Sequence, residues 1–493
     1  MRSPARTSLL ATLALALAVS GCTVGPDAGA PNAEEQSFAA VTRAPAEAVE
    51  AIATDSSAAA AIALSQRGFE RSETVVVAEA ERPSLEAGRR AALALGVPLL
   101  SPHPRLEVEL ERLRAQTVLG VGDVGELPGL VALEPTADAI ERAVAEQRAT
   151  PIVERDAIVL ADRAVAGRAA RTTAETAGLA LTTTRSSDPR TDSEAAAALA
   201  ARPEAPVVAL GPRVGDDLAY TVAVVRAGRE QPGGGHLIFP GRHVVALYGH
   251  PSTAALGMLG EQGPAATVQR AAAMADRYAA LEGDDPVVPA LEIIATVASG
   301  GAGKDGDYSI DTPIEVLRPL VDAAGEAGQY VVLDLQPGRA DFLAQAKRYR
   351  ELLAEPHVGL ALDPEWRLAP EEKPLERIGS VSIEEVERVA DWLAALTRER
   401  ALPQKLFVLH QFRTSMIRDR KRLRTDRPEL ATVIHVDGQG TQGGKQGTWT
   451  TLRRDAPDGV AWGWKNFVDE DTPILTPAQT WAVRPRPDLV TYQ

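Results

Sequence analysis

Short apolar runs recur at regular intervals through the second half of the chain, and segments with helical periodicity separate them. Short apolar runs of this kind, bounded by turn residues, predict buried strands. The runs cover 243–250, 287–298, 330–338, 358–366, 405–412, 431–440, 459–467 and 488–493. The amphipathic segments between them, at 264–281, 312–328 and 382–400, predict helices.

The last of these predicted helices has an N-terminal signature, because Glu385 follows Ser382 by three positions, as in a capping box. Eight strands that alternate with helices over about 250 residues are typical of a (β/α)8 barrel of the TIM type. An open, doubly wound sheet has the same alternation, but the count of eight favours closure. We therefore predict an α/β protein with a closed barrel over 240–493.

A strand, a turn, an alanine-rich helix and a second strand occur twice in the first half of the chain. The two copies cover 73–100 and 156–183, and further apolar runs that end in glycine follow them at 115–125 and 205–217. Gly96 and Gly178 take equivalent places in the two copies. Alternation at this spacing predicts βαβ units with parallel strands. We expect a tandem α/β region over 45–232.

The first copy resembles the type 2 cell wall binding repeat of Gram-positive surface proteins. The stretches that carry this resemblance are "TVVVAEAERPSLEAGRRAALALGVPLL" and "LERLRAQTVLGVGDVG", between about residues 70 and 125. In that family a strand leads through a proline turn into an alanine-rich helix and then into a Gly-x-Pro-Leu-Leu strand. The resemblance implies that cell wall polysaccharide is a partner. A generic structural βαβ domain is the alternative.

The beginning of the chain has the build of a secretory signal, in which Arg2 and Arg6 precede an apolar run that is too short to cross a bilayer. The run ends in Val19-Ser20-Gly21-Cys22, which resembles the lipobox of bacterial lipoproteins. That resemblance implies a signal over 1–22, cleavage before Cys22, and diacylation of Cys22 with palmitate-type chains, which are enough for stable membrane anchoring. An ordinary signal peptide with an incidental cysteine is the alternative.

Residues 23–44 are rich in glycine, proline, alanine and acids, which predicts a flexible tether. We therefore expect the chain at the extracytoplasmic face of a cell membrane, with membrane lipid as a partner through Cys22. The formal charge of −15 and the lack of a lysine-rich run disfavour nucleic acid as a partner. Because Cys22 is the only cysteine, the chain has no internal disulfide and no other thiol for catalysis or metal binding.

Polar side chains gather at the carboxyl ends of the predicted barrel strands, which is where the active sites of such barrels lie. Side chains two positions apart on a strand share a face. The sets with this spacing are Asp334 with Gln336, Asp363 with Glu365, His435 with Asp437 and Gln439, and Trp462 with Trp464; other strands add Tyr248, His250, Glu292 and His410. Each one alone is more often structural. Together they predict a ligand-binding or catalytic mouth, because so many polar groups are costly to bury without a use.

The stretch "GLALDPEW" resembles the end of strand four in family 18 chitinase-type glycosidases, where the pattern is Gly-x-Asp-x-Asp-x-Glu. Gly359, Asp363 and Glu365 match this pattern, and Ala361 stands in place of the first Asp. The resemblance implies that Glu365 protonates the glycosidic oxygen, and that Asp363 stabilises an oxazolinium-like intermediate formed by an N-acetyl group of the substrate. The residues themselves support part of this role, since two neighbouring carboxylates raise each other's pKa.

Several alternatives stay open. The seventh strand lacks the second glutamate of the common retaining barrels, so Asp334 or Asp437 is the candidate partner of Glu365, and their separation decides between retention and inversion. Trp366, Trp462 and Trp464 are candidates for stacking on sugar rings. The first rival is a non-catalytic wall-binding lipoprotein. The second is a metal-dependent hydrolase whose zinc ligands come from His250, His410, His435 and Asp437. The preferred interpretation requires no metal or cofactor.

Overall fold

The computed structural model describes residues 38–493, apart from 216 and 284. The expected signal segment, Cys22 and most of the expected tether therefore lie outside the described residues. The last part of the expected tether is a strand, because β1 (Ala40–Thr42) pairs antiparallel with β3 (Phe69–Ser72). The folded region thus begins before residue 44. No helix in the described part of the chain has the length and apolar character that crossing a membrane requires.

Two four-stranded sheets, in which every pairing is parallel, make up the α/β region. The first has the order β5-β4-β6-β7, from β4 (Thr74–Ala78), β5 (Leu99–Leu100), β6 (Thr117–Val121) and β7 (Leu130–Leu133). The second has the order β2-β10-β8-β9, from β2 (Val49–Ala53), β8 (Ile158–Asp162), β9 (Ala180–Thr184) and β10 (Val207–Gly211). The two copies therefore form separate sheets. The second sheet also takes in β2, which precedes both copies in the chain.

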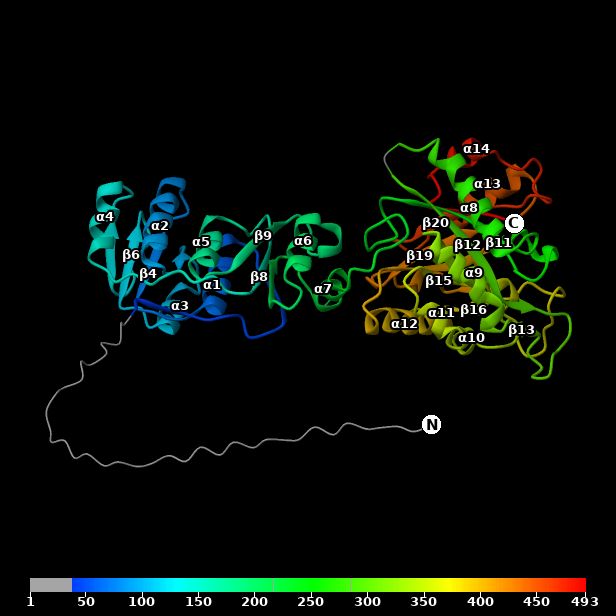
Figure 1. Cartoon of the computed structure of the whole chain (residues 1–493), viewed down its shortest axis with the longest axis horizontal. Helices are drawn as coiled ribbons and strands as arrows, with labels where there is room; N and C mark the ends of the chain where they lie inside the picture. Colours follow the sequence, from blue (N-terminus) through cyan, green and yellow to red (C-terminus); the bar gives the residue numbers. More distant parts are fainter. Residues whose placement is uncertain (1–37, 216, 284) are drawn as a thin grey trace, which may run out of the picture. The chain divides into compact units, whose positions relative to one another are not determined.

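Alanine-rich helices fill the core of this region (Figure 1). They are α1 (Ser57–Gly68), α2 (Arg82–Leu95) and α5 (Arg168–Thr176), and they are joined by α3 (Leu106–Leu113), α4 (Ala137–Ala145), α6 (Ser193–Ala201) and α7 (Leu218–Ala227). Gly96 and Gly178 adopt left-handed φ values of 63° and 75°. A Cβ at either glycine would lie 1.9 Å from a backbone oxygen, that of Thr150 or that of Val153. The same backbone constraint thus recurs in both copies.

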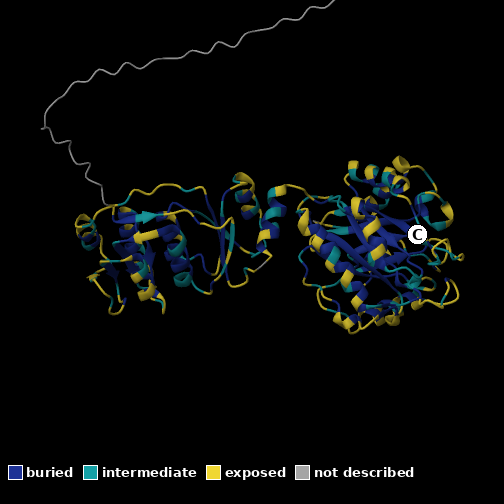
Figure 2. Cartoon of the chain, turned by 90° about the horizontal axis from the view of Figure 1, so that it is seen from below, coloured by how far each residue is buried: buried dark blue, intermediate teal, exposed yellow. Residues whose placement is uncertain are grey.

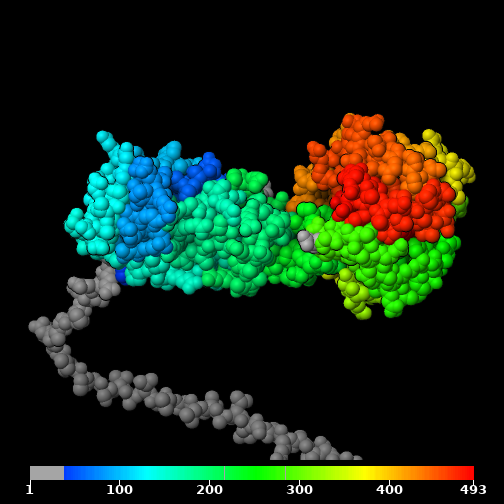
Figure 3. Space-filling view, turned by 90° about the horizontal axis from the view of Figure 1, so that it is seen from above, coloured from blue at the N-terminus to red at the C-terminus, as the bar shows by residue number. Residues whose placement is uncertain are grey.

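The second half of the chain is a closed barrel of parallel strands, as predicted. The strands are β11 (His243–Gly249), β12 (Val287–Ala298), β14 (Tyr330–Leu335), β15 (Val358–Leu362), β17 (Lys405–Gln411), β19 (Leu430–Val436), β20 (Ala461–Asn466) and β21 (Leu489–Tyr492). β11 pairs with both β12 and β21, and these pairings close the ring. In Figure 3 the end of the chain, in red, accordingly packs beside the first part of the barrel, in green.

Helices surround the barrel, and short strands extend it. The helices are α8 (Pro264–Ala279), α9 (Ile314–Glu326), α10 (Phe342–Arg348), α11 (Arg350–Leu353), α12 (Ile383–Glu399), α13 (Gln442–Arg453) and α14 (Pro477–Trp481). β13 (Ser309–Asp311) pairs with β12, and β16 (Val381–Ser382) pairs with β18 (Ile417–Arg418). Half of the predicted capping box forms, since Ser382 Oγ accepts the N–H of Glu385 at 3.3 Å. The Glu385 carboxylate instead accepts N–H groups of Phe342 and Arg367.

The barrel has two apolar layers, and the strands between them are buried (Figure 2). Successive side chains of a strand point to opposite sides, so that alternate residues form two sets, each of one parity. Side chains of one parity face the helices. Those of the other parity fill the interior, and the interior group includes Ala246, Ala290, Val332, Ala361, Val408 and Val433. Because this second parity continues to the carboxyl ends of the strands, the polar residues that end it are stacked on a rigid apolar base.

Candidate functional site

A cavity of about 520 Å³ lies at the carboxyl ends of the barrel strands. Its volume is in the range of small-molecule binding sites. The predicted site residues that line it are Tyr248, Gln336, Asp363, Glu365, Trp366, Asp437 and Gln439. Further lining residues that were not singled out from the sequence are Ile378, Phe412, Arg413, Gly438, Thr448, Lys465, Phe467 and Gln493. The lining thus combines carboxylates, cations and aromatic rings.

Glu365 lies in the short 3-10 turn Pro364–Trp366, directly after β15. The turn begins at Asp363, whose Oδ1 accepts the N–H of Glu365 at 3.2 Å. Burial raises the pKa of Glu365 to about 7, with the negative charge of Asp437 adding to the effect. Burial also raises the pKa of Asp363 well above its ordinary value, and so do neighbouring carboxylates. Both acids of this turn therefore bind a proton more tightly than a solvent-exposed carboxyl group does.

Asp437 follows β19 and behaves in the opposite way. Burial alone would raise the pKa of Asp437. The hydrogen bond from His410 and the positive charge of His410 lower this pKa below its ordinary value. Asp437 Oδ2 lies 2.9 Å from Nδ1 of His410. Its Oδ1 has no hydrogen-bond partner within residues 38–493 as described, and the residue lines the cavity. Two carboxyl groups with opposite protonation preferences, Glu365 and Asp437, thus line one cavity.

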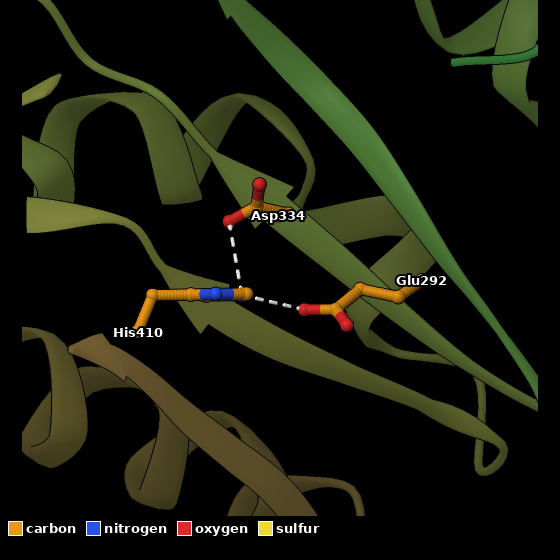
Figure 4. Close-up of side chains that lie close together, drawn as sticks. All are labelled: Glu292, Asp334 and His410. Carbon is orange, nitrogen blue, oxygen red and sulfur yellow. Dashed lines mark hydrogen bonds and ion pairs between the residues drawn. The ribbon is translucent and has the colours of Figure 1, made fainter. Parts of the chain in front are cut away.

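His410 is fully buried and does not line the cavity. Figure 4 shows that its ring approaches the carboxylates of Glu292 and Asp334. The Nε2 atom of His410 is 2.7 Å from Glu292 Oε1 and 3.9 Å from Asp334 Oδ1, and its Nδ1 faces Asp437. Burial alone would lower the pKa of His410, but Glu292, Asp334 and Asp437 hold it well above its ordinary value. Of the described residues, Glu292, Asp334 and His410 form the one group with the composition and spacing of a metal site.

Tyr248 connects the cavity to this buried group. Its hydroxyl donates to Asp334 Oδ2 at 2.8 Å and accepts from Gln336 Nε2 at 3.2 Å. Burial raises the pKa of Asp334 to about 6, where His410 opposes the rise and Glu292 adds to it. Lys465 Nζ lies 3.6 Å from the centre of the Tyr248 ring, which is a cation–π contact. Asp334 itself is fully buried and lies below the cavity.

The expected positions of Trp462 and Trp464 need correction. Both residues lie on the opposite face of β20, where their rings are 5.8 and 5.5 Å from that of Trp449. The inward parity of this strand instead carries Gly463, against His435, and Lys465, above Tyr248. Large apolar rings favour the helix-facing layer, whereas the alternating glycine and lysine mark the interior. That alternation is the sequence signal from which Lys465 could have been found.

Two further histidines of the predicted site also do not line the cavity. The Nε2 atom of His250 is 3.0 Å from Thr312 Oγ1, and burial lowers the pKa of His250. The Nε2 atom of His435 is 3.0 Å from Thr491 Oγ1, and burial together with the nearby charged His410 lowers the pKa of His435 well below its ordinary value. The structure therefore does not gather around one point the four residues considered as zinc ligands, which are His250, His410, His435 and Asp437. Only His410 among them also belongs to the group with the spacing of a metal site.

Comparisons of the chain with protein-family models, with curated proteins and with solved structures find no significant match.

Proposed function

We propose that the barrel is a glycosidase-like hydrolase that acts on polysaccharide, with Glu365 as the general acid. The observation that carries the proposal is the presence of Glu365 and Asp437 in the lining of one cavity, where one carboxylate oxygen of Asp437 accepts no hydrogen bond from any described residue. A pair of carboxyl groups in unlike environments is the basic equipment of glycoside hydrolysis. Trp366 and Phe467 add apolar faces to the same lining, of the kind on which sugar rings stack.

In this proposal Glu365 gives its proton to the glycosidic oxygen while the bond from that oxygen to the anomeric carbon breaks. Asp437 either takes a proton from the water that attacks the anomeric carbon, or attacks that carbon itself to form a glycosyl ester that water then hydrolyses. Asp363 orients the turn that carries Glu365, since its Oδ1 accepts the Glu365 N–H. Asp334 is assigned no contact with substrate, because it lies beneath the cavity.

The test is hydrolysis of peptidoglycan, chitooligosaccharides and other polysaccharides by the full-length protein and by Glu365→Gln. Loss of a general acid lowers kcat by about 10²–10⁴-fold. Glu371→Gln is the matched control, because Glu371 is an exposed glutamate in the loop after the same strand. Activity that survives Glu365→Gln removes Glu365 as the acid. Binding of a glycan without any turnover favours the non-catalytic alternative, and the anomeric configuration of the first product distinguishes the two roles of Asp437.

The setting that we propose for this reaction is the outer face of a cell membrane, with attachment through lipid on Cys22. The support is the sequence Val19-Ser20-Gly21-Cys22 after a short apolar run. The type 2 cell wall binding repeat-like stretch would then keep the barrel near wall polysaccharide. Incorporation of labelled palmitate into the wild-type chain but not into Cys22→Ala is the expected result. Equal labelling of both would refute the anchor.

A further inference from the structure

Three buried carboxylates surround His410, two of them beneath the cavity and the third, Asp437, in the cavity lining. Glu292, Asp334 and Asp437 are 1, 0 and 8% exposed, and all three approach the single ring of His410. A buried carboxylate is costly unless a positive charge or hydrogen bonds compensate it. The two ring nitrogens of His410 face Glu292 Oε1 and Asp437 Oδ2, so Asp334 receives its hydrogen bond from Tyr248, and only on Oδ2.

Glu292 and Asp334 each have one carboxylate oxygen without a partner among the described residues. Asp334 Oδ1 and Glu292 Oε2 are buried and accept no hydrogen bond from any described residue. Asp334 Oδ1 points toward Nε2 of His410, but their separation of 3.9 Å exceeds hydrogen-bond distance (Figure 4). An unpartnered oxygen in a fully buried side chain, aimed at two other potential ligand atoms, indicates that a positively charged species belongs between them.

The spacing of the three potential ligand atoms suits a metal ion. Nε2 of His410 is 2.7 Å from Glu292 Oε1 and 3.9 Å from Asp334 Oδ1, and the three residues offer ligand atoms that all lie within 4.8 Å of one another. Ligands held at about 2.1 Å from one ion in tetrahedral or octahedral arrangement are separated by roughly 3.0–3.4 Å. The Glu292 contact is shorter than this range and the Asp334 contact is longer, so binding of an ion requires the first to open and the second to close.

The groups around these three residues also fit. His410 Nδ1 lies 2.9 Å from Asp437, and metal-binding histidines characteristically donate their second N–H to a carboxylate. Tyr248 donates its hydroxyl to Asp334 Oδ2, which orients the other oxygen of that carboxylate. Tyr248 and Asp437 also line the cavity, so that the group lies directly beneath it.

We propose that Glu292, Asp334 and His410 bind a divalent transition-metal ion, Mn²⁺ or Zn²⁺, beneath the cavity floor. One imidazole nitrogen with two carboxylates favours these ions over Mg²⁺ and Ca²⁺, which prefer oxygen ligands alone. Three protein ligands leave positions for water on the side of the cavity. This inference is independent of glycan hydrolysis, and its three ligands differ from the set that the sequence suggested for zinc.

The experiment is a titration of the untagged, full-length protein with Mn²⁺ and with Zn²⁺ after removal of metal by a chelator. We expect one ion to bind per chain. Changes in the outer partners of a metal site cost about 10–100-fold in affinity, so Asp437→Asn is expected in that range and the ligand variants Glu292→Gln and Asp334→Asn beyond it. Glu385→Gln, a change at a buried carboxylate of the same barrel, is the matched control and keeps wild-type affinity.

Absence of binding, or equal affinity in the wild type and both ligand variants, would overturn the inference. If the variants fail to fold, X-ray absorption on the zinc-loaded wild type still decides, because a single imidazole among oxygen neighbours is expected. Two or more imidazoles, or none, contradict the assignment. If the chain binds the ion but cleaves no glycan, the metal site stands and the proposed function is refuted. If the chain cleaves glycan but binds no ion, the proposed function stands and the metal site is refuted.

Discussion

Replacement of Gly463 by alanine tests the inward face of β20, on which the position of Lys465 depends. A Cβ at Gly463 would lie 2.6 Å from Cδ2 and 3.0 Å from Cγ of His435. Carbon atoms pack best at about 3.5–4.0 Å, so the new methyl group overlaps the ring by roughly 1 Å. Overpacking of a rigid core costs about 1–3 kcal/mol.

The His435 ring cannot move away without a further loss. Its Nε2 is hydrogen-bonded to Thr491 Oγ1 at 3.0 Å, and its ring centre lies 4.9 Å from that of His410. Loss of that hydrogen bond adds about 0.5–1.5 kcal/mol. The two costs together lower the free energy of unfolding of Gly463→Ala by about 1.5–4.5 kcal/mol.

The assay is equilibrium unfolding in urea, followed by tryptophan fluorescence. All six tryptophans lie within 240–493, so the signal reports the barrel alone. Gly447→Ala in α13 is the control, because a Cβ there meets nothing within 4 Å. Alanine is better than glycine within a helix by roughly 0.5–1 kcal/mol, so this variant is expected to be more stable than the wild type. If Gly463→Ala unfolds at the wild-type urea concentration, Gly463 does not face His435, and the assignment of Lys465 to the cavity fails with it.

Three further predictions concern other parts of the molecule. Because the general acid must be protonated and the pKa of Glu365 is raised from 4.5 to about 7, kcat/KM should fall as the pH rises through about 7; a fall already near pH 4.5 would contradict this. Burial lowers the pKa of Lys405 from 10.5 to about 7, so between those pH values the unfolded chain binds the extra proton and stability rises with pH. The difference in urea midpoint between the wild type and Lys405→Met should therefore change between pH 7 and pH 9, and a constant difference would refute the shift. Gly178→Ala should lower the melting temperature, because its Cβ would lie 1.9 Å from Val153 O at a φ of 75°. In the control Gly228→Ala the new Cβ meets nothing within 4 Å, and only its φ of 64° is unfavourable. Equal losses of melting temperature in the two variants would contradict the close approach at Gly178.

Alternation along a strand was a sound guide to the face of most polar residues but not to their depth. Asp334 and Gln336 share a parity, as do His435 and Asp437, and the interior receives all four. In each pair the first residue is buried beneath the cavity and the second lines it. Two residues along a strand rise by about 6.6 Å, which is one layer of the barrel interior. Which layer opens to solvent depends on the stagger between strands, which no single strand encodes.

The seventh strand shows where the pattern was ambiguous. In "AWGWKN" one face of the strand carries Trp462 and Trp464, and the other carries Gly463 and Lys465. The two tryptophans are the more prominent pair, and they suggested the wrong face for the interior. The structure places Trp464 with Trp449 in an apolar cluster outside the strands, because burial of large rings stabilises packing against α13. The opposite parity then brings Lys465 to the cavity, where its charge faces Tyr248.

The sequence pattern alone predicts the order of strands and helices in this protein, and a number of strands that can close into a barrel. It also predicts the end of the barrel at which polar groups collect. Each of these depends on periodicity within single segments. Closure of the barrel alone decides which of those groups meet. Glu292 and His410 are 118 residues apart and come from β12 and β17, yet their side chains touch across the interior. Their charge states, and those of Glu365 and Asp437, follow from burial and mutual distance. Those are properties of the packed interior, and they do not exist until the ring of strands is complete.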